Sequence, residues 1–347
     1  MSDNSFTSMA RSDFGRLRTR ETITRIVSLL RAQRNEMLSL GDVRSLLRPD
    51  SETYRGMQTI ALARIVGSEG RYRDFNRAFL PKHDKLMRRW VSVDVAHYKD
   101  VQLPPIKVFE IGGSYFVRDG NHRVSVAKAQ GAEFIDAEVI SLSTEIPVTP
   151  GMTLDGLKQA VIAFEKARFL EATGLERLRP DARIDFTEVG RYDELLGHIR
   201  EHKWYINQRR STEIPFEEAA ASWYDTVYFP IVRIIRDSRL LARFPRSTEA
   251  DLYVYVGRHW GELGKRYGPL FTLEEAAEDF VLFRRDRFAR KIRKLGAAVA
   301  GMFGRGRGPR GSAGSGAGRN AGSASQRGQA GQSGQAGRSG RGQAPLV

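Results

Sequence analysis

The stretch that most constrains the fold runs from residue 106 to 140 and reads IKVFEIGGSYFVRDGNHRVSVAKAQGAEFIDAEVI. It begins with a β-branched run and the hairpin turn signal Gly112-Gly113, followed by a returning strand. A loop then leads into helical spacing that ends at Gly131, a typical helix C-cap. Residues 134–140 alternate apolar and polar side chains, as a half-buried strand does. The sequence therefore predicts strand, turn, strand, tight loop, helix and strand, which is an α+β arrangement.

The residues with functional chemistry lie at Asp119-Gly120-Asn121-His122-Arg123, where the second strand gives way to the helix. Gly120 lets the backbone turn sharply and approach a ligand closely. The residues after it open a helix, whose unpaired N–H groups and partial positive charge suit a phosphate. His122 adds a donor, and Arg123 could bind two phosphate oxygens as a fork. The alternative is that Asp119 or Asn121 caps the helix and Arg123 is an ordinary surface residue.

Strand, DGNHR and helix together resemble the ParB/sulfiredoxin superfamily, whose members hold nucleotide phosphates at this strand-to-helix turn. The preceding segment QTIALARIVGSEGRYRDF, residues 58–75, resembles the first box of ParB-like domains, with Arg71 and Arg73 at its arginine positions. The resemblance covers residues 56–145 and implies a ParB/sulfiredoxin-like mixed domain. The phosphate-binding residues that it implies are Gly120, Asn121, His122, Arg123, Arg71 and Arg73.

Two departures from the family pattern limit the activities and ligands that the resemblance implies. Sulfinic acid repair needs a cysteine where this chain has Asn121, and the chain contains no cysteine, so that activity is excluded. The second box of ParB proteins usually reads Gly-Glu-Arg-Arg, whereas this chain has the Asp-Gly-x-His-Arg form of the superfamily's small serine kinases. The resemblance therefore implies a nucleoside triphosphate, CTP or ATP, with Mg²⁺, and leaves the base open.

The basic charge of the chain is concentrated at its end. The formal net charge is +15, and residues 284–347 contain fourteen Lys or Arg and one acid, giving +13. Residues 304–347 consist largely of Gly, Arg, Ser, Gln and Ala and cannot bury a core, so we expect a disordered tail. Such a tail either binds DNA without reading sequence or serves as a spacer. No helix-turn-helix is recognisable, so sequence-specific operator binding is not expected.

The chain shows no targeting or membrane signal. Its first twenty residues are polar, and the longest small-apolar run near the end, residues 295–303, is about half of a membrane span. The absence of cysteine also removes disulfides and thiolate nucleophiles. We expect a cytoplasmic protein without a membrane span.

The N-terminal part, residues 1–55, reads as a helical segment. Residues 1–15 are expected to be disordered, 16–34 have helical periodicity, and 38–47 suggest a shorter helix. This pair of helices either packs on the next domain or mediates a homodimer, and the sequence does not choose between the two.

Residues 71–90 are both basic and aromatic, with seven basic and two acidic side chains. Such a composition can indicate nucleic-acid contact. We favour an amphipathic helix whose aromatic side chains Phe75, Phe79 and Trp90 lie in the core.

After a predicted linker at residues 144–151, several helical stripes predict an all-helical domain at 152–295. Within it, His198 and His202 fit an H-x-x-E-H pattern and would share one helix face. A third zinc ligand would have to come from Glu274, Glu275 or Glu278. We favour ordinary polar contacts for both histidines and expect no metal site.

Three functional hypotheses follow. The first is a ParB-like nucleotide-binding protein associated with DNA, in partitioning or transcriptional regulation. The second is a phosphotransferase or phosphodiesterase (nuclease) on the same scaffold, with Asp119 and His122 as catalytic residues and Glu69 or Asp74 as a second carboxylate. The third is an interaction module without a ligand. Whether the protein is an enzyme is left open.

Overall fold

The computed structural model describes residues 3–30, 35–208, 210–267 and 272–282. The chain divides within one helix into two compact units, Met1–Gly197 and a second that starts at His198. A six-stranded sheet with helices confirms the mixed α/β class. The predicted tail at 304–347 and the end of the predicted helical domain lie outside the described residues.

The first unit is built on one sheet with the strand order β1-β3-β5-β4-β6-β2. Its strands are β1 (Leu38–Ser39), β2 (Glu52–Ala61), β3 (Ile65–Ser68), β4 (Ile106–Ile111), β5 (Ser114–Asp119) and β6 (Phe134–Leu142). β4 and β5 form the predicted hairpin, β3 runs parallel to β5, and β6 runs parallel to β4. β2 pairs antiparallel with β6 at one edge. The sheet thus includes strands N-terminal to residue 56.

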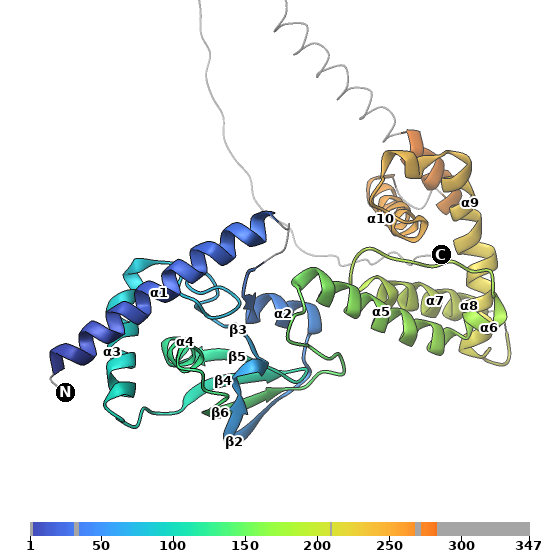
Figure 1. The fold of residues 1–347 in the computed structure, drawn as a ribbon. Helices are drawn as coiled ribbons and strands as arrows, with labels where there is room; N and C mark the ends of the chain where they lie inside the picture. The colour runs from blue at the N-terminus through green and yellow to red at the C-terminus, as the bar shows by residue number, and fades with distance from the viewer. Residues whose placement is uncertain (1–2, 31–34, 209, 268–271, 283–347) are drawn as a thin grey trace, which may run out of the picture. The chain divides into compact units, whose positions relative to one another are not determined.

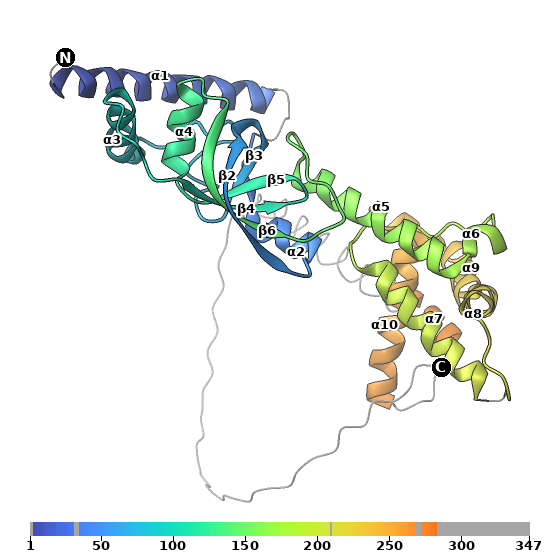
Figure 2. The ribbon, with the colours of Figure 1, turned by 90° about the horizontal axis from the view of Figure 1, so that it is seen from below.

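Helices cover both faces of this sheet (Figures 1 and 2). The helices of the first unit are α1 (Asp3–Leu30), α2 (Leu40–Leu47), α3 (Met87–Tyr98), α4 (Asn121–Ala129), α5 (Leu154–Thr173), α6 (Leu175–Leu178) and the start of α7 (Arg191–Asn207), with short 3-10 turns η1 (Leu62–Arg64) and η2 (Asp84–Leu86). α1, α3 and α4 share one core with the sheet, whereas α2 and α5 share the other.

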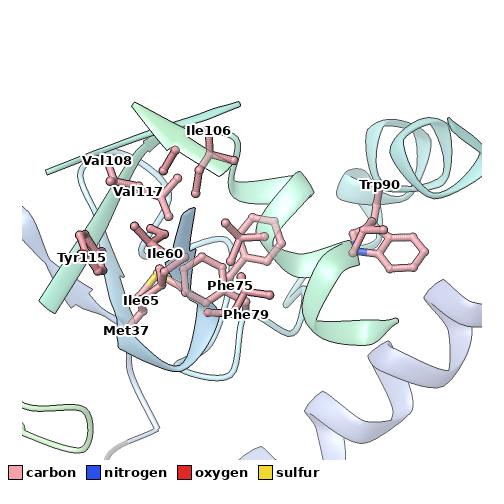
Figure 3. Packing of buried hydrophobic residues seen from close by; sticks show 14 of the residues in the cluster. Met37, Ile60, Ile65, Phe75, Phe79, Trp90, Ile106, Val108, Tyr115 and Val117 are labelled. Carbon is pink, nitrogen blue, oxygen red and sulfur yellow. The ribbon is translucent and has the colours of Figure 1, made fainter. Parts of the chain in front are cut away.

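The two cores follow from the period of two along each strand. Val108 and Val117 belong to the core under α1, α3 and α4, whereas their neighbours Phe109 and Phe116 belong to the core under α2 and α5. Figure 3 shows the first of these cores, in which strand side chains lie beside Phe75 and Phe79 from the loop after β3, and Trp90 of α3 lies farther from the sheet. Both faces of the central strands β4 and β5 are therefore largely buried, as a continuous apolar β5 indicates, whereas the edge strand β2 is mostly exposed.

The expectation that residues 1–15 are disordered is wrong, because α1 begins at Asp3. Ala10 and Phe14 are fully buried, and the Phe14 ring lies 5.8 Å from the Trp90 ring of α3. These apolar residues recur every four positions in an otherwise polar segment. This apolar stripe is narrow, so it is recognised only when residues are compared at the spacing of an α-helix.

Residues 71–90 do not form one amphipathic helix. The chain from Gly70 to His83 is a loop, and α3 begins only at Met87. The predicted burial of the aromatic side chains is confirmed, since Phe75, Phe79 and Trp90 are each at most 1% exposed. The aromatic positions were thus informative about the core, although they do not share one helix face.

The predicted linker at 144–151 packs on the sheet. Ile146 and Val148 are buried, and the Val148 N–H donates to the Gly112 carbonyl oxygen at 2.8 Å. The Ser114 hydroxyl donates to the Val148 carbonyl oxygen at 2.5 Å. The two prolines in this segment mark an extended strap, which the sequence does not distinguish from a linker.

The second unit contains only helical elements among its described residues. They are the end of α7, α8 (Phe216–Trp223), a π-helical turn (Tyr224–Tyr228), α9 (Phe229–Asp237), a 3-10 turn η4 (Leu240–Arg243), α10 (Glu249–Tyr267) and a further helix at 273–282. Pro230 lies in the first turn of α9, and the π turn before it widens the helix where proline donates no hydrogen bond. None of the helices in the described ranges has the length and apolar character needed to cross a membrane.

Candidate functional site

The candidate site lies where two parallel strands end together. In the β3–β5 pair Ser68 is opposite Val117, and the Glu69 N–H continues the pairing to the Val117 carbonyl oxygen at 3.0 Å. The loop after β3 and the turn after β5 therefore start side by side. The carboxyl ends of parallel strands in α/β sheets are a common place for ligands.

Gly120 forms the turn from β5 into α4 in a conformation that glycine favours, with φ of +100°. A Cβ atom there would lie 2.5 Å from Ile106 Cγ2, so there is no space for a side chain. No side chain caps the N-terminus of α4. The capping roles considered for Asp119 and Asn121 are therefore wrong, and the first N–H groups of α4 lack side-chain caps.

The Arg123 side chain packs against the Gly120 turn and the segment before β4. Its guanidinium donates to the Pro104 carbonyl oxygen, to the Pro105 carbonyl oxygen at 2.7 Å and to Asp119 Oδ2 at 2.6 Å. Its side chain is 15% exposed. Arg123 thus ties the turn to the segment that enters β4, and in this conformation both terminal nitrogens of its guanidinium donate to protein oxygens.

Asn121 and His122 hold polar atoms that are buried without a partner. Asn121 is 6% exposed, and neither its Oδ1 nor His122 Nδ1 has a hydrogen-bond partner among the described residues. Leaving such a group unpaired costs about 1–3 kcal/mol. This turn therefore carries unused hydrogen-bonding capacity directly beside the start of α4.

His122 sits between a ring and positive charges. Its imidazole packs edge-on against Phe75, with the ring centroids 5.3 Å apart. Burial, together with the charges of Arg89 and Arg71, lowers the pKa of His122 to about 4, although the charge of Asp74 opposes the shift. The imidazole is therefore neutral at pH 7 and offers one donor and one acceptor nitrogen.

Arg71 comes from the loop after β3, and its charge acts on the His122 imidazole. Its guanidinium donates to Asp74 Oδ2 at 2.8 Å, and Lys85 lies 3.5 Å from the other carboxylate oxygen. Burial raises the pKa of Asp74, but the hydrogen bond from Arg71 and the charges of Lys85 and Arg71 outweigh it, and the pKa is lowered. Arg73 has its guanidinium over the Tyr72 ring, 5.5 Å from the centroid.

Sequence reasoning missed Arg89. It is an exposed residue of α3, and its charge acts on the His122 imidazole. Only its membership of the basic run at 71–90 hinted at a role. Arg89 and Arg71 come from different elements, so their convergence on His122 depends on how α3 packs against α4.

The loop after β3 is held in place from both sides. Asn76 Oδ1 accepts hydrogen bonds from the N–H groups of Ala78 and Leu80, both at 3.0 Å. Ser125 of α4 donates to the Phe79 carbonyl oxygen at 2.7 Å and accepts from Trp90 Nε1 at 2.9 Å. This one buried hydroxyl joins the loop, α3 and α4, so the loop approaches α4 with a fixed geometry.

The two proposed catalytic residues lie on different sides of the turn. Asp119 pairs with Arg123 and its side chain is 62% exposed, whereas His122 packs against Phe75. No hydrogen bond joins Asp119 to His122 among the described contacts. Glu69 has its carboxylate 4.0 Å from Arg118, on the strand that leads to Asp119.

The described residues contain no group of three or more His, Cys, Asp or Glu side chains that could hold a metal ion. In the second unit His198 Nδ1 lies 3.3 Å from the Tyr253 hydroxyl, and His202 Nε2 lies 3.1 Å from the Ser222 hydroxyl. These are the ordinary polar contacts expected for the H-x-x-E-H pattern. A Mg²⁺ ion at the Gly120 turn would take most of its ligands from water and ligand phosphates.

Comparisons with known proteins identify no relative. No protein-family model matches the chain, and neither curated proteins nor solved structures gave a match. A functional proposal for this chain therefore depends on the residues of the Gly120 turn and on the resemblance of the DGNHR motif to the ParB/sulfiredoxin superfamily.

Proposed function

We propose that this chain is a nucleotide-binding protein of the ParB/sulfiredoxin-like type that associates with DNA. The observation that supports it best is the pair of buried, unpartnered polar atoms on Asn121 and His122, at a glycine turn flanked by Arg71 and Arg89. A ligand with both phosphate and hydroxyl groups, such as a nucleoside triphosphate, would use the exposed cations and the unpaired atoms together.

In this proposal the phosphates bind at the start of α4. The first N–H groups of the helix face them, and Arg71 and Arg89 supply positive charge from the loop and from α3. Arg71 would exchange part of its pairing with Asp74 for the phosphate. Neutral His122 and Asn121 would hydrogen-bond to the ligand or to its bound water, and Mg²⁺ would enter with the phosphates.

Arg123 takes a different role from the one that the motif implies. Because its donors reach Pro104, Pro105 and Asp119, it would hold the Gly120 turn in shape and act on the ligand indirectly. Arg73, over Tyr72, would close the site only after its side chain moves. Arg71 and Arg89 are therefore the better positions at which to test phosphate binding.

The DNA association is proposed from charge alone. Residues 284–347 carry +13 and lie outside the described residues. Contacts to phosphates release counterions, so binding to duplex DNA should weaken steeply as salt is raised.

Isothermal titration calorimetry of the full chain with CTP, ATP, ADP and GTP in the presence of Mg²⁺ tests the nucleotide site. We expect binding of at least one nucleotide, and a loss of about tenfold or more in Arg71→Gln and Arg89→Gln. Arg88→Gln is the matched control, because Arg88 is the exposed neighbour of Arg89 on α3 and is not among the charges that act on His122. Absence of heat with all four nucleotides would refute the proposal.

Product analysis of the same samples separates binding from catalysis. Release of a nucleoside diphosphate or of phosphate that is lost in Asp119→Asn would establish the phosphotransferase alternative, and cleavage of added DNA that is lost in the same variant would establish the phosphodiesterase (nuclease) alternative. Binding without turnover would leave a nucleotide-responsive protein. Thermal-shift measurements that detect no ligand would favour the interaction module.

A further inference from the structure

A second candidate site lies in the other unit, on the exposed face of α7. One side of this helix carries four polar or aromatic residues at helical spacing, namely Arg200, Lys203, Trp204 and Asn207. Ile199, at the edge of this side, is fully buried. The exposed side thus combines cations, an amide and an indole.

Trp204 is the unusual member of this face, because its side chain is 58% exposed. Large aromatic residues usually bury most of their surface, as Trp223 does in the same unit, at 1% exposed. An indole left open to solvent on a rigid helix offers a flat surface for stacking. This exposure has no structural explanation among the packing contacts of α7.

A pocket forms beside this indole, where the chain after α7 runs alongside the helix. It has a volume of about 700 Å³, within the range of small-ligand sites. Its lining residues are Arg200, Lys203, Trp204, Asn207, Gln208, Arg210, Ser211, Glu213 and Phe216. The Asn207 Oδ1 atom accepts a hydrogen bond from the Ile214 N–H at 3.1 Å, which fixes the segment that forms the wall.

The charge of the lining favours an anion. It contains three cations and one acid, and that acid, Glu213, pairs with Lys203 at 2.6 Å. Arg200 has no ion-pair partner among the described residues, and Arg210 lies 3.4 Å from Glu218 in a solvent-exposed pair. The end of α7 carries partial negative charge, so Arg200, about two turns before that end, is a more favourable position for a phosphate than Arg210, which follows it.

We propose that this pocket binds one nucleotide of a single-stranded nucleic acid, with the base stacked on the Trp204 indole and the phosphates on Arg200 and Arg210. Aromatic stacking and backbone charge are the two contacts that single-strand-binding proteins combine. Base pairing would hide the face of the base, so a duplex cannot use Trp204. The site is separate from the Gly120 turn and does not depend on the nucleotide proposed there.

The test is binding of labelled dT12 and of the matched 12-base-pair duplex to the full chain, measured by fluorescence anisotropy at several salt concentrations. Trp204→Ala should weaken dT12 binding by roughly tenfold and leave duplex binding unchanged. Trp204→Phe keeps a stacking ring and should stay within about threefold of the wild type. Phe229→Ala, which removes an exposed aromatic ring elsewhere in the unit, should have no effect.

The charged positions provide an independent readout. Arg200→Gln and Arg210→Gln should each reduce the slope of log K against log salt for dT12 by about 0.7. Arg233→Gln is the matched control, because Arg233 is an exposed arginine of α9 outside the pocket lining. Glu213→Gln should tighten dT12 binding about two- to threefold, since it frees Lys203 from its partner.

Two results would overturn the proposal. One is unchanged dT12 binding in Trp204→Ala, or an equal loss for dT12 and duplex. The other is binding of AMP to the pocket that disappears in Trp204→Ala while dT12 binding persists, which would assign the pocket to a free nucleotide. Because Arg71→Gln and Arg89→Gln should leave dT12 binding intact, failure here is distinguishable from failure at the Gly120 turn.

Discussion

The Gly120 turn and the α7 pocket both combine arginines with ring side chains, but their polar groups are satisfied in different ways. At the turn, Asn121 and His122 hold buried atoms without partners among the described residues, and both terminal nitrogens of the Arg123 guanidinium donate to protein oxygens. At the pocket, Arg200 and Trp204 face solvent. The turn thus presents buried polar atoms, whereas the pocket presents exposed side chains.

This difference predicts what each site can discriminate. Buried groups with fixed geometry penalise a ligand that leaves them unpaired, so they provide specificity. Exposed cations and an exposed ring accept many sequences and respond mainly to charge and stacking. A chain with both would select a nucleotide at the turn and hold nucleic acid at the pocket without reading its sequence.

Alanine substitutions of Trp90 and Trp204 test the comparison with the largest expected difference. Trp90→Ala should lower the free energy of unfolding by about 3–5 kcal/mol, because the indole is fully buried between α1, α3 and α4. Trp204→Ala should change it by less than about 0.5 kcal/mol, because the ring is mostly exposed. Urea unfolding followed by circular dichroism measures both. Equal losses would mean that the α7 face is covered in solution.

Two glycines with positive φ test how tightly the turn is packed. Gly120→Ala should cost about 3 kcal/mol, because a Cβ would lie 2.5 Å from Ile106 Cγ2 in addition to the backbone strain. Gly131→Ala should cost only about 1 kcal/mol, since φ is +76° but no atom lies within 4 Å of the added methyl group. Thermal unfolding of the pair isolates the steric part. Similar losses would show that the start of β4, where Ile106 lies, can move aside.

Local patterns predicted the elements of the turn well. The hairpin at Gly112-Gly113 and the helix after Gly120 follow from the period of the apolar residues and from two turn signals. These features depend on neighbours along the chain, so a sequence carries them directly. The mixed α/β class followed from the same stretch.

Long-range packing was not predictable in the same way. The approach of Arg89 to His122 depends on how α3 packs against α4. The position of Val148 depends on the Gly112 carbonyl oxygen in the hairpin turn, which accepts a hydrogen bond from the Val148 N–H. Arg123 was expected to face a phosphate, but the two prolines before β4 supply carbonyl oxygens to it. No local propensity encodes these contacts, because the partners are separated by many residues.

A single hydroxyl connects the loop to the turn, and its removal should have an intermediate effect. Ser125→Ala should cost about 1–3 kcal/mol, because it leaves the buried Trp90 Nε1 donor without its acceptor. Ser45→Ala removes an exposed hydroxyl that donates to its own helix, at Gly41, and should cost less than about 0.5 kcal/mol. Chemical denaturation measures both. A negligible effect of Ser125→Ala would mean that water replaces the hydroxyl and that the loop is less fixed than the contacts indicate.

The smallest expected effect concerns pH and tests whether His122 is neutral in the folded protein. Its pKa of about 4 lies below the ordinary value of 6.5, so the unfolded state binds a proton first as the pH falls. His122 should therefore reduce stability progressively between pH 6.5 and 4, with no further loss below that range. We expect about 1 kcal/mol, less than the full shift implies, because solvent screens the partly exposed ring. Stability curves of the wild type and His122→Gln should converge over this window as pH falls.

The same histidine distinguishes the two regions once ligand is present. Phosphates bound at the start of α4 would favour the imidazolium, so a nucleotide that binds there should raise the pKa of His122, which NMR titration of its ring protons measures. Addition of dT12 should leave that titration unchanged, because the proposed single-strand site lies on α7. A shift with dT12 and none with any nucleotide would assign the Gly120 turn to nucleic acid and remove the distinction between the two sites.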